Sequence, residues 1–94
     1  MKIYLPHIHY TVFVRRFSKP PKEIQSAKAW AHHTKNGEVI LYLPKRNMPG
    51  DVAHELIHVL QFICADRNMD FVREQEHMAY IMHYLMGKVY GHTY

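Results

Sequence analysis

Two histidines four residues apart, with a glutamate directly after the first, form the most specific chemical pattern in this sequence. They are His54, Glu55 and His58, within the stretch 52–59. Residues i and i+4 lie on one face of an α-helix, so both imidazoles can bind the same cation. Glu55 is turned by about 100° from His54, close enough to contact a water on that cation without binding the cation itself. The pattern therefore predicts a divalent-metal site with a base beside it.

The apolar residues of the same stretch predict the helix that would hold this site. On a helical wheel with His54 at 0°, His58 falls near ~40°, and an apolar group clusters between about 140° and 200°. This group consists of Val52, Leu56, Val59 and Ile63. Pro49-Gly50-Asp51 supplies a proline suited to the first turn and an acidic group near the positive end of the helix dipole. We expect this helix to begin there and to end near residues 65–68.

Length and composition predict one globular domain over residues 1–94. The chain has 94 residues, too few for two domains, and its 48% apolar content exceeds that of disordered chains. The formal charge of +4 is uneven, since residues 1–50 hold nine Lys/Arg against two Glu and residues 51–94 hold three against six Asp/Glu. The acidic half contains the histidine pair, which suits a dication.

Cysteine usage and the N-terminus predict a cytoplasmic protein. The single cysteine, Cys64, cannot form an internal disulfide, which suits a reducing compartment. Pro6, His7 and His9 interrupt any apolar run near the N-terminus, so we expect no signal peptide. No stretch has the length of apolar sequence that a membrane crossing needs, and we expect no membrane partner.

Residues 2–17 alternate between the two faces of an expected β-strand. One face carries Ile8, Tyr10, Val12 and Val14, and the other carries His9, Thr11, Phe13 and Arg15. His7 and His9 share a face and can pair on a metal, although exposed strand positions are the simpler interpretation. The proline pair within residues 18–22 predicts a loop after this strand.

A β-hairpin is expected next, because Asn36-Gly37 separates two strand-like segments, 27–34 and 38–43. The second segment is apolar on both faces and is typical of an inner strand, whereas the first, which carries Trp30, is more polar and indicates an edge strand. His32 and His33 near the turn are interpreted as solvated.

A second helix is expected over residues 69–88, from apolar residues at helical spacing. They are Phe71, Met78, Met82, Leu85 and Val89, and the methionines are interpreted as core residues. Gly87 and Gly91 are expected to mark the helix end, with residues 88–94 as a tail.

A catalytic zinc usually has three protein ligands, so a third is needed besides the histidine pair. Gln61 and Cys64 stand where a metzincin would continue with glycine and histidine, which excludes that class. Cys64 points away from the histidine face and is interpreted as a small buried hydrophobe. Asp66 and Asp70 are weaker candidates because both lie in the connection between the helices.

The second helix offers the other candidates: Glu74, Glu76, His77 and His83. Glu76 is favoured because it shares a face with Tyr80 and His83, away from the methionine-rich face. A carboxylate with a tyrosine and a histidine beside it is typical of a supported metal ligand. A solvent-exposed helix glutamate is the alternative.

His54-Glu55-x-x-His58, followed eighteen residues later by Glu76, resembles the gluzincin branch of the zincin metallopeptidases. The resemblance is to its smallest members, the minigluzincins, and to short metallopeptidase-like proteins often encoded by phages and prophages. It implies an α+β minimal zincin-like fold over nearly the whole chain: a small antiparallel or mixed sheet with a hairpin, packed on a metal helix and a glutamate helix. The sequence has no counterpart of the residue with which many gluzincins stabilise the oxyanion.

The residues and the resemblance together predict a zinc peptidase. Zn²⁺ on His54, His58 and Glu76 would activate a water, with Glu55 as general base and acid. Tyr80 and His83 are the candidate oxyanion donors. A peptide or unfolded protein would add as a strand to the edge segment 27–34.

Two alternatives stay open at this point. In the first, the metal only stabilises a binding module, and His92 or a tail tyrosine closes its coordination. In the second, a basic nucleic-acid-associated protein carries a zincin core, with binding centred on Arg15, Arg16, Lys45 and Arg46. Nucleic acid is not the expected partner, because no specific interleaving of basic and aromatic residues occurs along the sequence.

Overall fold

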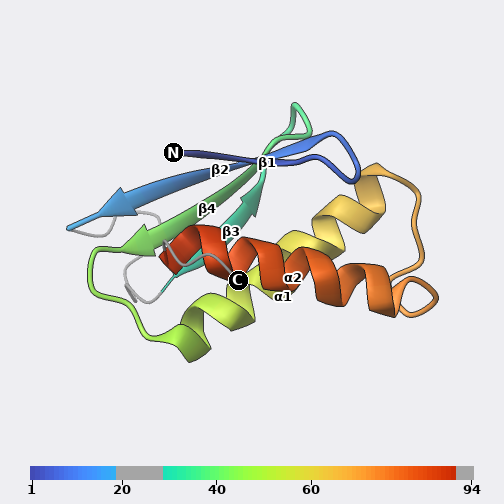
Figure 1. Cartoon of the computed structure of the whole chain (residues 1–94). Helices are drawn as coiled ribbons and strands as arrows, with labels where there is room; N and C mark the ends of the chain where they lie inside the picture. Colours follow the sequence, from blue (N-terminus) through green and yellow to red (C-terminus); the bar gives the residue numbers. More distant parts are fainter. Residues whose placement is uncertain (19–28, 91–94) are drawn as a thin grey trace.

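The computed structural model describes residues 1–18 and 29–90. Within these residues the elements follow in the order β1 (Lys2–Leu5), β2 (Tyr10–Phe17), β3 (Trp30–His33), β4 (Val39–Pro44), α1 (Pro49–Asp66) and α2 (Gln75–Tyr90) (Figure 1). The predicted α+β class is confirmed, since a mixed four-stranded sheet is combined with two helices.

The strands are ordered β1-β2-β4-β3 across the sheet. β1 and β2 are antiparallel, β2 and β4 are parallel, and β4 and β3 form the antiparallel hairpin. The hairpin prediction is therefore confirmed, with β4 as an inner strand and β3 at an edge. Residues 27 and 28 of the predicted first arm, and residues 19–22 of the predicted loop, lie outside the described residues.

The hairpin turn depends on Gly37, which has a φ of 81°. Its N–H donates to Thr34 O at 3.0 Å, and Thr34 N–H donates to Glu38 O at 2.8 Å. A turn followed by a residue in the left-handed region is one of the common hairpin connections, and glycine adopts that region without a steric penalty.

The expectation of one strand over residues 2–17 is wrong, because a turn at residues 6–9 divides it into β1 and β2. Pro6 has no N–H to donate, Ile8 N–H donates to Leu5 O at 3.3 Å, and His9 has a positive φ of 48°. The chain therefore reverses, and Leu5 pairs with Tyr10. Tyr10, Val12 and Val14 share one face of β2, as predicted, and the structure shows that this face is the buried one.

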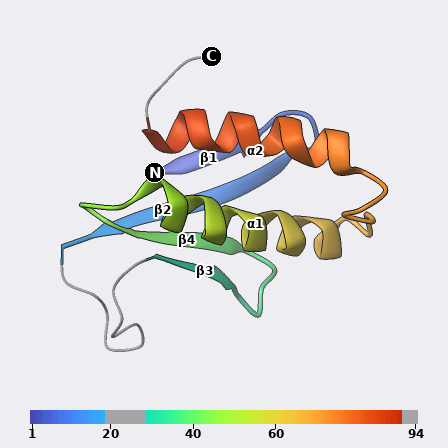
Figure 2. The same cartoon turned by 90° about the horizontal axis from the view of Figure 1, so that it is seen from below.

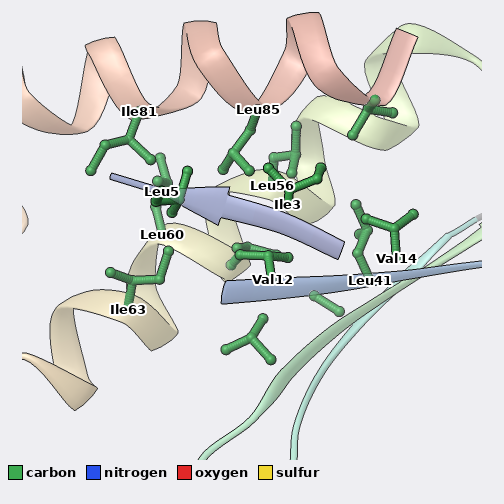
Figure 3. Close-up of a cluster of buried hydrophobic side chains, with 14 of the residues drawn as sticks. Ile3, Leu5, Val12, Val14, Leu41, Leu56, Leu60, Ile63, Ile81 and Leu85 are labelled. Carbon is green, nitrogen blue, oxygen red and sulfur yellow. The ribbon is translucent and has the colours of Figure 1, made fainter. Parts of the chain in front are cut away.

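Both helices lie on the same side of the sheet (Figure 2). α1 packs on β3 and β4, while α2 packs on α1 and β1. Figure 3 shows part of the core between these layers, where side chains from the helices meet those of the sheet. Its labelled residues are Ile3, Leu5, Val12, Val14, Leu41, Leu56, Leu60, Ile63, Ile81 and Leu85, all of them buried.

The second helix differs from its predicted bounds at both ends. Residues 71–74 form a turn, in which Asp70 Oδ1 accepts hydrogen bonds from the N–H groups of Val72 and Arg73 in the manner of an N-cap, and α2 begins only at Gln75. Gly87 lies inside α2 and is buried, so it does not end the helix. A glycine ends a helix by adopting positive φ, and Gly37 is the only described glycine that does so. Gly91 lies outside the described residues.

Neither α1 nor α2 combines the length and the apolar content that a membrane crossing needs; this holds for the part of the chain that the structure describes.

Candidate metal centre

The exposed face of α1 brings His54, Glu55 and His58 together. One ligand atom from each lies within 4.8 Å of the others, and among the described residues no other group of three or more such side chains does so. The two imidazole centroids are 5.1 Å apart, and His54 Nε2 is 3.7 Å from Glu55 Oε2. Nitrogen and carboxylate donors at this spacing are the set that zinc binds in proteins.

The opposite face of α1 fixes the rotation of this helix. Val52, Leu56, Val59 and Ile63, predicted to be buried, are fully buried. Because these residues hold the helix against the sheet, the histidines about half a turn away face outward. The His54 side chain is accordingly 70% exposed, whereas that of Glu55, between the histidines and the sheet, is only 16% exposed.

Glu55 is attached to the edge strand. The N–H of Ala31 in β3 donates a hydrogen bond of 3.1 Å to Glu55 Oε1. This hydrogen bond holds the orientation of the carboxylate and leaves Oε2 toward His54. Sequence reasoning did not identify Ala31 as part of the site, because a backbone donor leaves no side-chain pattern.

Gln61 is a second residue that sequence reasoning missed. Its side-chain oxygen Oε1 lies 3.1 Å from His58 Nδ1, an arrangement that suits a proton on Nδ1. With that tautomer, His58 Nε2 has the lone pair that binds metal, as in many sites where a neighbour orients a histidine ligand. Gln61 stands three residues after His58, on the same helical face, and this spacing is the sequence signal that could have identified it.

The structure does not bring Glu76 to the histidine pair, and Glu76 is not a member of the group described above. α2 runs back along α1 (Figure 2), and Cys64 Sγ contacts Met78 Sδ at 3.5 Å. Cys64 is six residues beyond His58, or about 9 Å along the helix. The first turn of α2, with Glu76, therefore lies beside the far end of α1.

The predicted oxyanion donors Tyr80 and His83 also lie on the exposed side of α2. Tyr80 is 67% exposed. Neither residue belongs to the three-residue group, whose members come from α1 alone. His92, suggested as a closing ligand, lies outside the described residues.

The other predicted histidine sites have different partners. His7 contacts the rings of His77 and Tyr84 at 6.3 and 6.1 Å, while His9 Nδ1 forms a hydrogen bond with Tyr4 Oη. His7 and His9 therefore do not pair on a metal in this arrangement.

The histidines of β3 were predicted to be solvated. This prediction is wrong, because each of them has a partner. His33 Nε2 lies 2.9 Å from Asp66 Oδ1 and its ring stacks on Phe62, since β3 ends beside the end of α1. His32 contacts the ring of Trp30 at 5.0 Å.

The hydroxyl of Tyr10 and the thiol of Cys64, both buried near the end of α1, are held in their neutral forms. Burial raises the pKa of Tyr10, and its hydrogen bond to Asp66 raises the pKa further. Burial also raises the pKa of the Cys64 thiol, followed by repulsion from Asp70 and Glu74. Cys64 is thus a buried hydrophobe, as predicted, and not a thiolate ligand.

No protein-family model matches this chain, and neither the curated proteins nor the solved structures provide a match.

Proposed function

We propose that this protein is a zinc-dependent peptidase that hydrolyses peptides or unfolded protein. The observation that carries the proposal is the group of His54, Glu55 and His58 beside the edge strand β3, with Glu55 hydrogen-bonded to Ala31. Two histidines for a metal, a carboxylate beside them and an extended edge for a substrate are the parts that metal-assisted peptide hydrolysis needs. A cytoplasmic location, favoured by the single cysteine, belongs to the same proposal.

When bound, zinc would supply the acidity that activates a water and polarises the scissile carbonyl. His54 and His58 would hold it through imidazole nitrogens, and Gln61 would orient His58 by accepting a hydrogen bond from its Nδ1. Glu55 would accept the water's proton and later donate it to the leaving amine. Its partly buried carboxylate, fixed by Ala31, keeps one oxygen available for this transfer.

The substrate would lie along β3. Among residues 1–18 and 29–90, β3 pairs only with β4, so its other edge can receive main-chain hydrogen bonds from an extended peptide. Main-chain pairing selects for extended chains and not for a particular sequence, which favours unfolded protein as the substrate class.

The test combines metal content with cleavage of an unfolded protein. The purified chain is expected to hold one zinc per molecule and to cleave denatured casein in a chelator-sensitive manner. Glu55→Gln is expected to retain the zinc and to lose about 100-fold or more of the activity. Glu38→Gln, which changes an exposed glutamate at the hairpin turn, is the matched control and is expected to remain active. An active Glu55→Gln variant would remove Glu55 from this role.

A non-catalytic zinc-binding module is the second candidate, favoured by one observation. Glu55 is the only carboxylate of the group, since Glu76 lies elsewhere, so Glu55 can serve as the third ligand itself. The same variant separates the two functions. In a non-catalytic module, Glu55→Gln would lose zinc, and the wild-type chain would not cleave casein.

A further inference from the structure

The face of the sheet opposite the helices carries aromatic and basic side chains from all four strands. Neither α1 nor α2 covers this face (Figure 2). Strand alternation points the following residues toward it: Lys2, Tyr4, Thr11, Phe13, Arg15, Trp30, His32, Ile40 and Tyr42. We call these nine residues the open sheet face. None of them is acidic.

The strand register places the aromatic residues next to the basic ones. Arg15 is opposite Tyr42, and Tyr42 is opposite Trp30, so these three form one row across β2, β4 and β3. Neighbouring strands are about 4.8 Å apart, so the row spans about 10 Å. The Tyr42 and Trp30 rings stack at a centroid distance of 5.4 Å and an interplanar angle of 21°.

The adjacent row repeats the combination. Lys2 is opposite Phe13, Phe13 is opposite Ile40, and Ile40 is opposite His32. The ammonium of Lys2 lies over the Phe13 ring, 5.7 Å from its centroid. Each row therefore has a cation at the β1/β2 side and rings extending toward β3, where His32 also contacts Trp30.

We propose that the open sheet face binds single-stranded nucleic acid. Aromatic rings stack with bases of any sequence, and Lys or Arg beside them binds the phosphates; proteins that bind single strands combine these two features. Lys2 and Arg15 would contact the backbone, while Phe13, Tyr42 and Trp30 would contact the bases. This activity is separate from peptide hydrolysis, because the open sheet face lies on the other side of the sheet from α1.

The charge of the open sheet face favours a nucleic acid over a peptide as its ligand. An unfolded peptide pairs with the edge of β3 through its main chain, whereas the open sheet face offers flat rings and cations without an acidic group to pair with lysine or arginine of a partner. The sequence alone shows no such cluster, because its members come from four strands and become neighbours only through the order β1-β2-β4-β3.

The experiment uses Trp30, the only tryptophan of the chain, as the probe. The zinc-loaded full chain is titrated at low salt with a single-stranded oligothymidylate of about 12 nucleotides, and with inorganic polyphosphate of equal charge. We expect saturable quenching of Trp30 fluorescence by the oligonucleotide and weaker binding of polyphosphate, which has no bases. Equal binding of both, or no saturable quenching, would overturn the proposal.

Charge-reversal variants locate the binding surface without disturbing the core. Arg15→Glu is expected to weaken binding about 10-fold or more and to lower the salt dependence by about one released ion. Arg73→Glu, an exposed change in the connection between the helices, is the matched control and is expected to bind within about twofold of wild type. Equal effects of the two variants would contradict this placement.

Two further measurements give independent outcomes. Glu55→Gln is expected to bind the oligonucleotide like the wild type, which separates this inference from the proposed peptidase. Unfolded casein is expected to quench Trp30 from the edge of β3 whether or not the inference holds, so a lack of quenching by the oligonucleotide is the outcome that would overturn it.

Discussion

The backbone N–H of Ala31 donates a hydrogen bond of 3.1 Å to Oε1 of Glu55, and this contact joins the edge strand β3 to the helix that carries the histidine pair. It fixes the orientation of the one carboxylate in the candidate metal centre. Its removal therefore tests how far the proposed base depends on the strand beside it.

Ala31→Pro removes this donor. Proline is tolerated on an edge strand where its missing N–H faces away from the sheet. A hydrogen bond to a charged group contributes about 1.5–3 kcal/mol, so we expect kcat to fall about 10- to 100-fold. Ala31→Ser retains the N–H and is expected to keep the kcat of the wild type. An unchanged kcat in Ala31→Pro would show that Glu55 needs no support from β3.

Zinc affinity tests the ligand set that the structure assembles. His58→Ala removes a ligand of the group, and we expect a loss of about 100-fold or more in zinc affinity, measured by competition with a chromogenic chelator. Glu76→Ala changes a residue beside the far end of α1, and we expect affinity within about twofold of wild type. A large loss in Glu76→Ala would mean that metal binding draws the start of α2 to the histidines, as the gluzincin resemblance implies.

Core packing by α1 is tested by two adjacent residues. Leu56 is fully buried, whereas Ile57 is 39% exposed. Leu56→Ala is expected to lower the free energy of unfolding by about 2–5 kcal/mol, because it removes buried methyl groups and leaves a cavity. Ile57→Ala is expected to cost less than about 1 kcal/mol. Urea unfolding followed by circular dichroism measures both, and similar losses would place the helix in a different rotation.

Because of Tyr10, the free energy of unfolding is expected to depend on pH in the alkaline range. Its ordinary pKa is 10.0 and the folded state raises it, so the unfolded chain loses this proton first as the pH rises. Its contribution is therefore present below about pH 10 and is lost progressively above it. We expect Tyr10→Phe to be less stable than wild type near pH 8 by about 1 kcal/mol, and this difference to shrink toward pH 11. Thermal unfolding across this range measures the effect, and a difference that grows with pH would contradict it.

The elements that are specified by residues close in sequence could be predicted. The apolar stripe that contains Leu56 predicted the rotation of α1, and Asn36-Gly37 predicted the hairpin, because both signals come from residues close in sequence. The division of residues 2–17 into β1 and β2 was not predicted, although the buried positions change from odd-numbered residues in β1 to even-numbered residues in β2. The start of α2 was placed too early, since a turn at residues 71–74, capped by Asp70, precedes the helix.

The sequence by itself determined which groups can bind a metal, because the spacing of His54 and His58 places them on one helical face whatever the rest of the chain does. Tertiary structure alone decided which strand donates to Glu55 and where Glu76 lies. It also gathered Phe13, Trp30 and Tyr42 on one face. These relationships depend on strand order and on the direction in which α2 packs against α1, which arise from contacts between segments far apart in the chain and leave no local pattern to read.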